Sequence, residues 1–292
     1  MKKMIREMFL FLIILFVVPV MLVVGICGRD AVVWEKKSGI EDYLPTLLMQ
    51  DIPMEMKIEA IKAQAVLTRS NVTKALREGE LSFSDLKNQK KKSEEKLENK
   101  KYWAYYEKCL DAVQKTNFQV LAYEKQVQYV PFHRLSAGVT RDGWEVLQKE
   151  NYAFCSGVDS SSDVRAKEYR RQYFYSHQEL TDILNAYYPE AGLVMDSVGQ
   201  DLYIAERDSA GYVLQMQVGN LKIPGEEFRR VLGFASSHFD IEESGDQIRF
   251  ISQGIGHGLG MSQYGADEMA RNGADYLAIL EHYFPQMDIL YN

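Results

Sequence analysis

A continuous stretch of eighteen uncharged, mostly apolar residues constrains this chain more than any other feature. It runs from Phe9 to Ile26 and follows a short start that carries three basic residues. A helix of this length spans roughly 27 Å at about 1.5 Å per residue, close to the ~30 Å hydrocarbon core of a bilayer. The stretch is longer than the apolar part of a secretory signal and lacks a small-residue cleavage site. It therefore predicts a single-pass anchor in the cell membrane over residues 1–30, with an extracytoplasmic domain over residues 31–292.

The rest of the chain has the composition of a folded protein. Of the 292 residues, 46% are hydrophobic, which suffices for one or two packed domains. The formal net charge of −7 provides no general basic field, so we expect no nucleic-acid partner. Three cysteines, Cys27, Cys109 and Cys155, cannot form a closed disulfide framework. Whether Cys109 pairs with Cys155 stays open, because sequence does not set their distance.

Helical and strand patterns are mixed along the chain, which predicts an α+β fold with mainly antiparallel strands. Residues 55–78 place apolar side chains at helical spacing between Pro53 and Gly79, which indicates a helix of about six turns. The mixed-charge run of residues 85–103 is typical of a solvated helix or loop, so we expect a charged helical insertion near residues 80–103. Strands and hairpins are indicated at residues 118–132 and 202–223, and a last strand at residues 248–253. Further helices are indicated at residues 177–189 and on both sides of Gly273.

A glycine-rich loop from Gly254 to Gly260 encloses His257 and is followed by Gln263 and Tyr264. The loop lacks the βαβ unit and the acidic residue that a dinucleotide-binding loop requires. Glycines let a backbone approach a ligand or another segment closely. Two interpretations stay open: a sugar-binding cleft that uses these polar side chains, and a tight buried turn whose histidine bonds to the main chain.

The chain lacks the residue patterns of several common active sites. His133 precedes a polar loop that contains Ser136, but the nearest cysteine, Cys155, lies twenty-two residues away and no HExxH sequence occurs. No GxSxG sequence marks a nucleophilic serine. We therefore expect no metal, no cofactor and no acyl-transfer chemistry.

Carboxylates are the remaining candidates for chemistry, and Asp51 stands in the most informative position. It lies in the sequence MQDIPMEM, where an extended segment is expected to meet the helix of residues 55–78. The positive end of a helix dipole favours the ionised carboxylate. Asp51 is accordingly interpreted either as a base or as the capping residue of that helix.

Four blocks of the sequence resemble the SpoIID/LytB family, in family order. Residues 40–70 resemble E-D-Y-L, then E-M-P, then a helix that begins near E-A-L-K-A-Q-A and ends in A-R-T. Residues 132–140 resemble F-H-S-x-S-x-G-x-T, and residues 225–239 resemble G-x-x-x-R-x-x-L-G-x-x-S-x-x-F. Residues 254–285 contain GIGHGLGMSQYGA, close to the most specific family block, G-x-G-H-G-x-G-M-S-Q-Y-G-A. Together the blocks cover nearly all of residues 40–290.

The resemblance implies a membrane-anchored lytic transglycosylase that acts in sporulation, during engulfment, on peptidoglycan glycan strands stripped of their stem peptides. It also implies a complex with stage II sporulation proteins P and M. The catalytic residue of the family is the glutamate of E-M-P, and Asp51 occupies that position here. An aspartate carboxyl falls back by about 1.5 Å relative to glutamate, and a misplacement near 1 Å costs roughly 10²-fold in rate.

This departure from the family leaves three outcomes open: a slow enzyme, an enzyme whose main chain has shifted to suit aspartate, or a glycan-binding, amidase-enhancing relative that no longer cuts. We expect Asp51→Glu to preserve or raise activity. The zinc site of some relatives, one His and two Cys, is not carried over, because His133 is its only match here. The resemblance further implies six substrate-binding residues, of which all but Ser136 are expected to share one cleft with Asp51: Arg69, His133, Ser136, His257, Gln263 and Tyr264.

Overall fold

The computed structural model describes residues 39–95 and 97–291. The chain divides into a unit that ends at Asp42 and a compact unit from Tyr43 to Asn292. In the first unit the described residues include a short 3-10 helix, η2 (Ile40–Asp42). The predicted anchor of residues 1–30 lies outside the described residues, and within those that are described no helix has the length and hydropathy to cross a bilayer.

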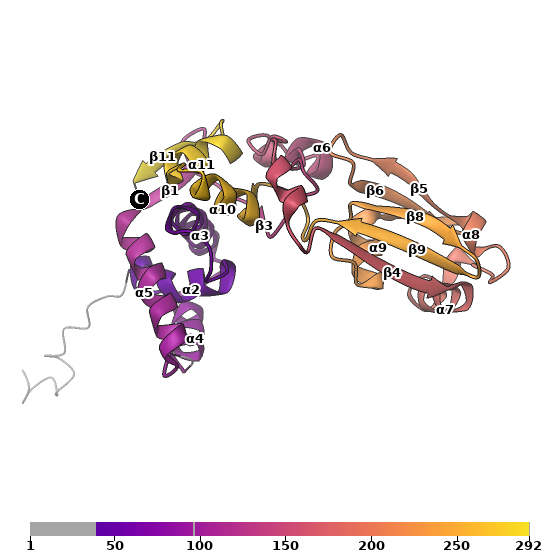
Figure 1. The fold of residues 1–292 in the computed structure, drawn as a ribbon. Helices are drawn as coiled ribbons and strands as arrows, with labels where there is room; N and C mark the ends of the chain where they lie inside the picture. The colour runs from indigo at the N-terminus through magenta and orange to yellow at the C-terminus, as the bar shows by residue number, and fades with distance from the viewer. Residues whose placement is uncertain (1–38, 96, 292) are drawn as a thin grey trace, which may run out of the picture. The chain divides into compact units, whose positions relative to one another are not determined.

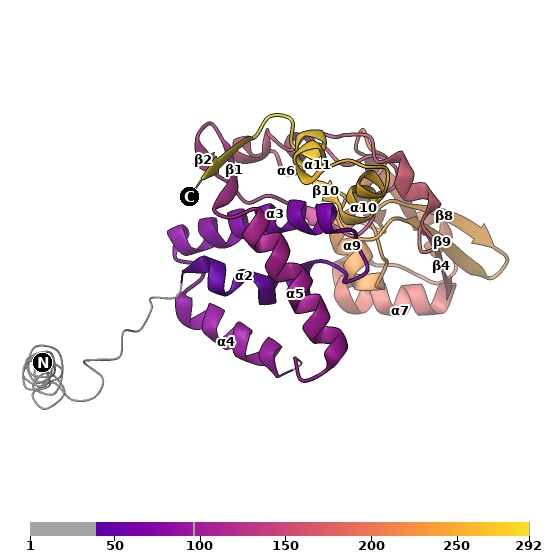
Figure 2. The ribbon, with the colours of Figure 1, turned by 60° about the vertical axis from the view of Figure 1, so that its left-hand side comes forward.

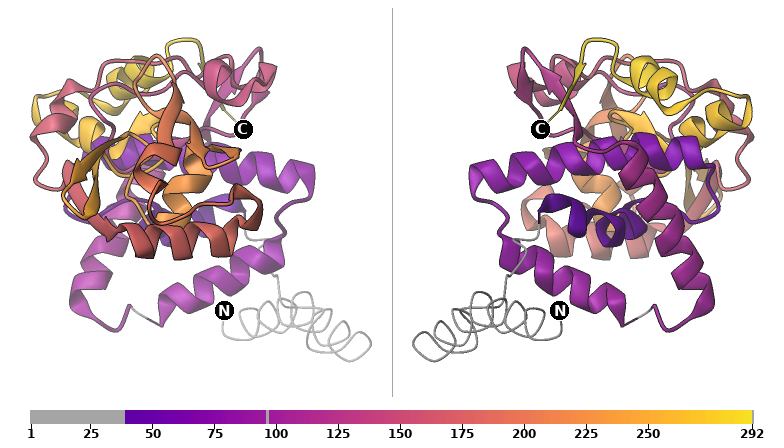
Figure 3. Two further views of the ribbon diagram at one scale, coloured as in Figure 1. Left: turned by 90° about the vertical axis from the view of Figure 1, so that its right-hand side faces the viewer. Right: turned by 90° about the vertical axis from the view of Figure 1, so that its left-hand side faces the viewer.

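Helix α3 (Ile58–Glu78) is the centre of the helical part of the second unit. It packs against four other helices, which are α2 (Leu44–Asp51), α5 (Lys100–Lys115), α10 (Gln263–Arg271) and α11 (Tyr276–Tyr283). Figures 2 and 3 show α2 lying between α3 and α4 (Phe83–Glu94). Because neighbours surround α3, most of its middle section is buried, including polar residues that must then find partners inside the protein.

The predicted helix over residues 55–78 is thus confirmed, with a start three residues later than expected. It ends because Gly79 adopts a left-handed conformation, with φ +74°, and donates its N–H to the carbonyls of Ala75 and Leu76. A Cβ atom on Gly79 would meet no atom within 4 Å, so a substitution there is costly only through backbone strain.

We expect Gly79→Ala to lower the free energy of unfolding by about 1 kcal/mol, the cost of a left-handed conformation for an alanine. Denaturant unfolding of both proteins measures the difference. Equal denaturation midpoints would show that this helix end tolerates alanine.

The strands form small sheets, most of them antiparallel, as Figure 1 shows. β1 (Gln119–Tyr123) pairs with β2 (Gln126–Val127) and with β11 (Asp288–Tyr291). The strands and hairpin predicted over residues 118–132 are thus confirmed, and the hairpin turns where Glu124 and Lys125 both have positive φ. β3 (Phe132–His133) and β10 (Met261–Ser262) pair in parallel.

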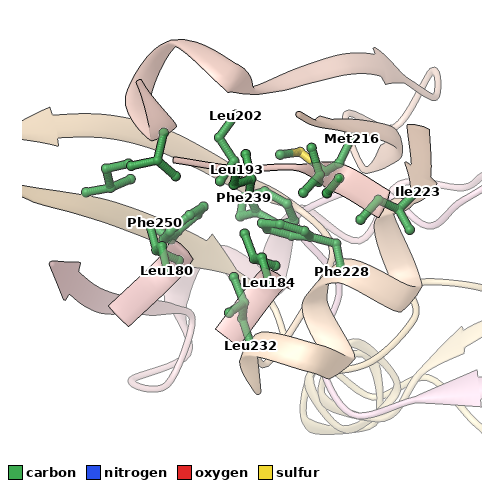
Figure 4. Packing of buried hydrophobic residues seen from close by; sticks show 14 of the residues in the cluster. Leu180, Leu184, Leu193, Leu202, Met216, Ile223, Phe228, Leu232, Phe239 and Phe250 are labelled. Atoms are coloured by element: carbon green, nitrogen blue, oxygen red, sulfur yellow. The ribbon is translucent and has the colours of Figure 1, made fainter. Parts of the chain in front are cut away.

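Two three-stranded antiparallel sheets and three helices enclose a second hydrophobic core, seen in Figure 4. The aromatic rings of Phe228, Phe234, Phe239 and Phe250 meet at its centre, with centroids 4.8 to 6.1 Å apart. The elements around it are β4 (Arg170–Ser176), β9 (Gln247–Gln253) and β8 (Phe239–Ser244); β5 (Leu202–Arg207), β6 (Val213–Val218) and β7 (Leu221–Pro224); and α7 (His177–Tyr187), α8 (Val198–Asp201) and α9 (Gly225–Leu232). The predicted α+β class with antiparallel sheets is confirmed.

Four short helices complete the second unit: α6 (Gly143–Leu147), η3 (Glu150–Tyr152), η4 (Ser161–Arg165) and η5 (Pro189–Ala191). The mixed-charge run forms α4 and the start of α5, and α4 buries a single side chain, Leu86.

Cys109 and Cys155 are both buried and free.

Candidate active site

Asp51 is the last residue of α2, and the reason lies in the residues that follow it. Pro53 disfavours a helical conformation for the residue before it. Ile52 is accordingly extended, with φ −126° and ψ 145°, and its N–H closes the helix on the carbonyl of Leu48. This abrupt end leaves the Asp51 side chain beside the middle of α3.

Asp51 lines a cavity of about 210 Å³ between α2, α3 and α4. Thr68 of α3 donates a hydrogen bond from Oγ1 to Oδ2 of Asp51 at 2.6 Å. Burial raises the pKa of Asp51 above its usual value, and the Thr68 hydrogen bond opposes this rise. Because burial has the larger effect, the carboxyl group of Asp51 holds its proton to a higher pH than an exposed carboxyl group does. The rest of the cavity is formed by Leu47, Asn71, Val72, Leu81, Leu86, Gln89 and Phe132.

The interpretation of Asp51 as a cap of the long helix is wrong. The residue at the N-cap of α3 is Lys57, and its N–H donates to Oδ1 of Asp267 on α10 at 2.6 Å. Asp51 lies instead at the negative end of α2, which disfavours the carboxylate. The extended segment expected before residue 51 is a helix, because Leu44 to Leu48 bury an apolar face in the core.

The raised pKa of Asp51 makes protein stability depend on pH in a defined direction. The folded state binds this proton more tightly than the unfolded state, so the favourable contribution to stability is complete below the ordinary aspartate pKa of 3.8 and is lost as pH rises through the folded pKa. We expect Asp51→Asn, whose amide oxygen still accepts from Thr68, to unfold at a higher temperature than the native protein at pH 7. This advantage should disappear below pH 3.8. Melting temperatures of both proteins measured across this pH range check the direction of the effect. A difference in melting temperature that stayed the same at every pH would contradict the prediction.

The first residue of α10, Gln263, bonds to the main chain of Asp51. Nε2 of Gln263 donates to the main-chain oxygen of Asp51 at 2.6 Å and to Oε1 of Gln64 at 3.1 Å. Ser262 precedes this residue, caps α10 and donates from Oγ to the buried carboxylate of Asp163 at 2.6 Å. The pairing of β10 with β3 places Phe132 of the cavity wall beside the same segment. Gln263 and Asp51 are thus joined directly.

His133 and His257 lie against each other, with ring centroids 5.8 Å apart, and both bond to the main chain of the glycine loop. Nδ1 of His133 donates to the carbonyl of Leu259 at 3.0 Å, and Nδ1 of His257 accepts from the N–H of Leu259 at 3.1 Å. Burial lowers the pKa of His133 to about 3 and that of His257 below its usual value, so both rings are neutral at pH 7. Within the described residues no hydrogen bond or ring contact joins either histidine to Asp51.

The glycines of this loop are required by close packing. A Cβ atom on Gly260 would meet the carbonyl oxygen of Pro131, and one on Gly256 would lie 2.8 Å from Cβ of His133. Both glycines have positive φ. Two interpretations of the loop were open, a sugar-binding cleft and a tight buried turn. These contacts are those of a tight turn whose histidine bonds to the main chain.

Arg69 follows Thr68 in α3 but makes contacts away from Asp51. Its buried guanidinium donates to the carbonyl of Val113 at 3.1 Å, to Oγ1 of Thr116 at 3.3 Å and to the carbonyl of Gln119 at 3.1 Å. These groups belong to the end of α5 and the start of β1. A cation there satisfies carbonyls that a helix end leaves unpaired.

Of the two remaining sequence candidates, Ser136 lies on the loop after β3, which pairs with the glycine loop through Leu135 and Ile255, and Tyr264 lies in the first turn of α10. Oγ of Ser136 accepts from the N–H of Gly138 at 3.1 Å, while its own N–H donates to Asp163 at 2.7 Å. Tyr264 is only partly buried, and its N–H donates to the carbonyl of Arg134 at 3.2 Å.

Sequence reasoning missed three residues of this site: Gln64, Thr68 and Asp163. Gln64 and Thr68 are four residues apart, a spacing that places both on the face of α3 that meets Asp51. That spacing was the available signal. Nothing local marks Asp163, whose carboxylate is fully buried between the segments of Ser136 and Ser262.

Comparison with known proteins adds independent information. The family model described as stage II sporulation protein (SpoIID) matches residues 31–123. The stage II sporulation protein D of Bacillus amyloliquefaciens is 30% identical over 263 residues, which is 86% of this chain and 74% of that protein. The protein of the same name from Bacillus subtilis is 28% identical over 84% of this chain and 72% of its own length.

A shorter similarity joins the chain to the amidase enhancer of Bacillus subtilis. It is 31% identical over 86 residues, which is 28% of this chain and 12% of that protein. The two long matches extend over most of both chains and agree with the family model. This chain therefore belongs to the SpoIID family of stage II sporulation proteins.

Proposed function

We propose that this protein is a lytic transglycosylase that cleaves the glycan strands of peptidoglycan during sporulation. The observation that carries the proposal is the carboxyl group of Asp51. Asp51 lines a cavity, burial raises the pKa of its carboxyl group, and it occupies the position of the glutamate in the family's E-M-P sequence. A general acid must hold its proton to a higher pH than an ordinary carboxyl group does, and burial shifts the pKa of Asp51 in that direction.

The reaction uses one carboxyl group twice. Asp51 first gives its proton to the glycosidic oxygen, and the bond from the muramyl C1 to that oxygen breaks. The resulting carboxylate then takes the proton of the muramyl 6-hydroxyl, whose oxygen bonds to C1 and closes a 1,6-anhydro ring. No water is consumed and the acid is regenerated, unlike in hydrolysis by two carboxylates.

The cavity wall suits a sugar ring in its composition. Phe132, Leu47 and Leu81 line the cavity, are partly exposed, and provide apolar surface for the C–H face of a pyranose. Asn71 is already bonded through both side-chain atoms to the main chain of Val130, at 3.1 and 2.7 Å, so it fixes the wall.

The alternative function is glycan binding without cleavage, by which the protein would enhance an amidase. It is favoured by the partial similarity to an amidase enhancer and by the replacement of the family glutamate with Asp51. Mass spectrometry of denuded glycan incubated with the protein separates the two functions. Anhydro-muramyl ends that depend on Asp51 support the enzyme, whereas bound but intact strands support the alternative.

The site of action is part of the same proposal. The apolar stretch of residues 9–26 supports a single-pass anchor with the catalytic domain outside the cell membrane, where stage II sporulation proteins P and M are the expected partners. Protease added to intact protoplasts is expected to digest the domain. Digestion only after lysis would place the domain in the cytoplasm and overturn this location.

A further inference from the structure

Four hydrogen bonds connect the main chain of Asp51 to its own carboxyl group through three side chains. Gln263 donates to the Asp51 carbonyl at 2.6 Å and to Oε1 of Gln64 at 3.1 Å. Gln64 donates from Nε2 to Oγ1 of Thr68 at 3.5 Å, and Thr68 donates to Oδ2 of Asp51 at 2.6 Å. Gln64, Thr68 and Gln263 are all buried, with exposed fractions of 0%, 4% and 3%. Water therefore cannot replace a lost bond without cost.

The direction of each bond in this ring follows from the groups that take part. A main-chain carbonyl only accepts, so the amide nitrogen of Gln263 faces Asp51 and Gln64 must present its side-chain oxygen to that nitrogen. The side-chain nitrogen of Gln64 consequently faces Thr68, whose hydroxyl accepts there. A hydroxyl has a single proton, and this one is left for Oδ2 of Asp51.

We propose that Thr68 is a positioning residue that holds Oδ2 of Asp51, so that Oδ1 carries the proton transferred to the glycan. This inference rests on the proposed function, in which Asp51 is the general acid. Because Thr68 donates to Oδ2 whether Asp51 is protonated or ionised, the same oxygen, Oδ1, first releases the proton and then accepts one from the muramyl 6-hydroxyl. The carboxyl group need not rotate between the two steps.

The sequence around Thr68 supports a matched pair. Where the family pattern has glutamate in E-M-P and alanine before the arginine of A-R-T, this chain has Asp51 and Thr68. Aspartate is shorter by one methylene, about 1.5 Å. The hydroxyl of Thr68 reaches the shorter side chain, and we expect the longer side chain of a glutamate at residue 51 to carry its carboxyl group past this hydroxyl. We therefore expect the two positions to be coupled.

A titration of Asp51 tests the hydrogen bond without using activity. The full-length protein is labelled with ¹³C at aspartate carboxyl carbons, and the Asp51 signal is identified by its loss in Asp51→Asn. The Thr68 bond lowers the pKa of Asp51 against the effect of burial, so Thr68→Val, which keeps the shape and removes the hydroxyl, is expected to raise that pKa. Thr68→Ser, which keeps a hydroxyl, is expected to leave it close to the native value. An unchanged pKa in Thr68→Val would overturn the inference.

Kinetics with denuded glycan test the positioning role. Thr68→Val is expected to lower kcat about tenfold with KM within twofold, since misdirected proton transfer slows chemistry rather than binding. Thr68→Val should begin to lose activity at a higher pH than the native protein does. Thr68→Ser should restore most of kcat. A change in KM alone would contradict positioning. A native protein that forms no anhydro product would overturn the proposed function, while the titration still decides for or against the Thr68 bond.

The coupling of the two positions is tested with glutamate at residue 51. Asp51→Glu combined with Thr68→Ala restores both family residues and is expected to turn over several times faster than Asp51→Glu alone. Thr68→Ala in the native background is expected to be slower than the native protein. Equal rates for Asp51→Glu with threonine or alanine at residue 68 would show that the two positions act independently.

Discussion

Replacement of Asp51 with asparagine is expected to reduce the formation of anhydro-muramyl ends by roughly 10²- to 10⁴-fold, with glycan affinity largely kept. The substitution removes the proton donor and leaves the shape of the side chain nearly unchanged. The amide oxygen still accepts from Thr68, so the contact between α2 and α3 survives. Product analysis by mass spectrometry and a separate glycan-binding assay measure the two quantities.

Glu55 offers a matched control for this experiment. It is the next carboxylate along the chain, it is exposed, and it lies 3.8 Å from Arg134 in an ion pair at the surface. Such a pair contributes little to stability, so Glu55→Gln is expected to fold normally and keep its turnover. If Glu55→Gln lost activity while Asp51→Asn kept it, Glu55 would be the acid and Asp51 would not.

Replacement of Arg69 with alanine is expected to lower the free energy of unfolding by roughly 3–5 kcal/mol. The change leaves the carbonyls of Val113 and Gln119 and the hydroxyl of Thr116 without this donor in a buried place. It also removes a large side chain from the interface of α3, α5 and β1. Denaturant unfolding measures the loss.

Arg165 provides the comparison for Arg69. Its side chain is 62% exposed and pairs with Glu268 at 3.2 Å, so Arg165→Ala is expected to change stability by at most about 0.5 kcal/mol. The resemblance to the family implied that Arg69 binds substrate. If Arg69→Ala proved as stable as the native protein and lost glycan affinity, that role would hold and the structural one would not.

Local patterns in the sequence were sufficient to predict the helices and strands whose surroundings stay the same along their length. The apolar spacing of residues 58–76 and the glycine at residue 79 predicted α3, because a helix that packs on several neighbours repeats the same requirement at every turn. The alternation in residues 202–223 likewise predicted the hairpins of β5, β6 and β7. Short elements such as α2 were missed, since two turns carry little periodic signal.

The identity of the chemical groups was also determined by sequence, down to an aspartate where the family has a glutamate. What sequence could not determine was the state of those groups. The pKa of Asp51 depends on burial against α3 and α4 and on the hydroxyl of Thr68, seventeen positions away, while its main chain is held by Gln263, 212 positions away. The neighbour of Thr68, Arg69, points at other partners because successive helical residues face different directions. Desolvation and hydrogen-bond direction are properties of the space around a side chain, so only the tertiary structure decided them.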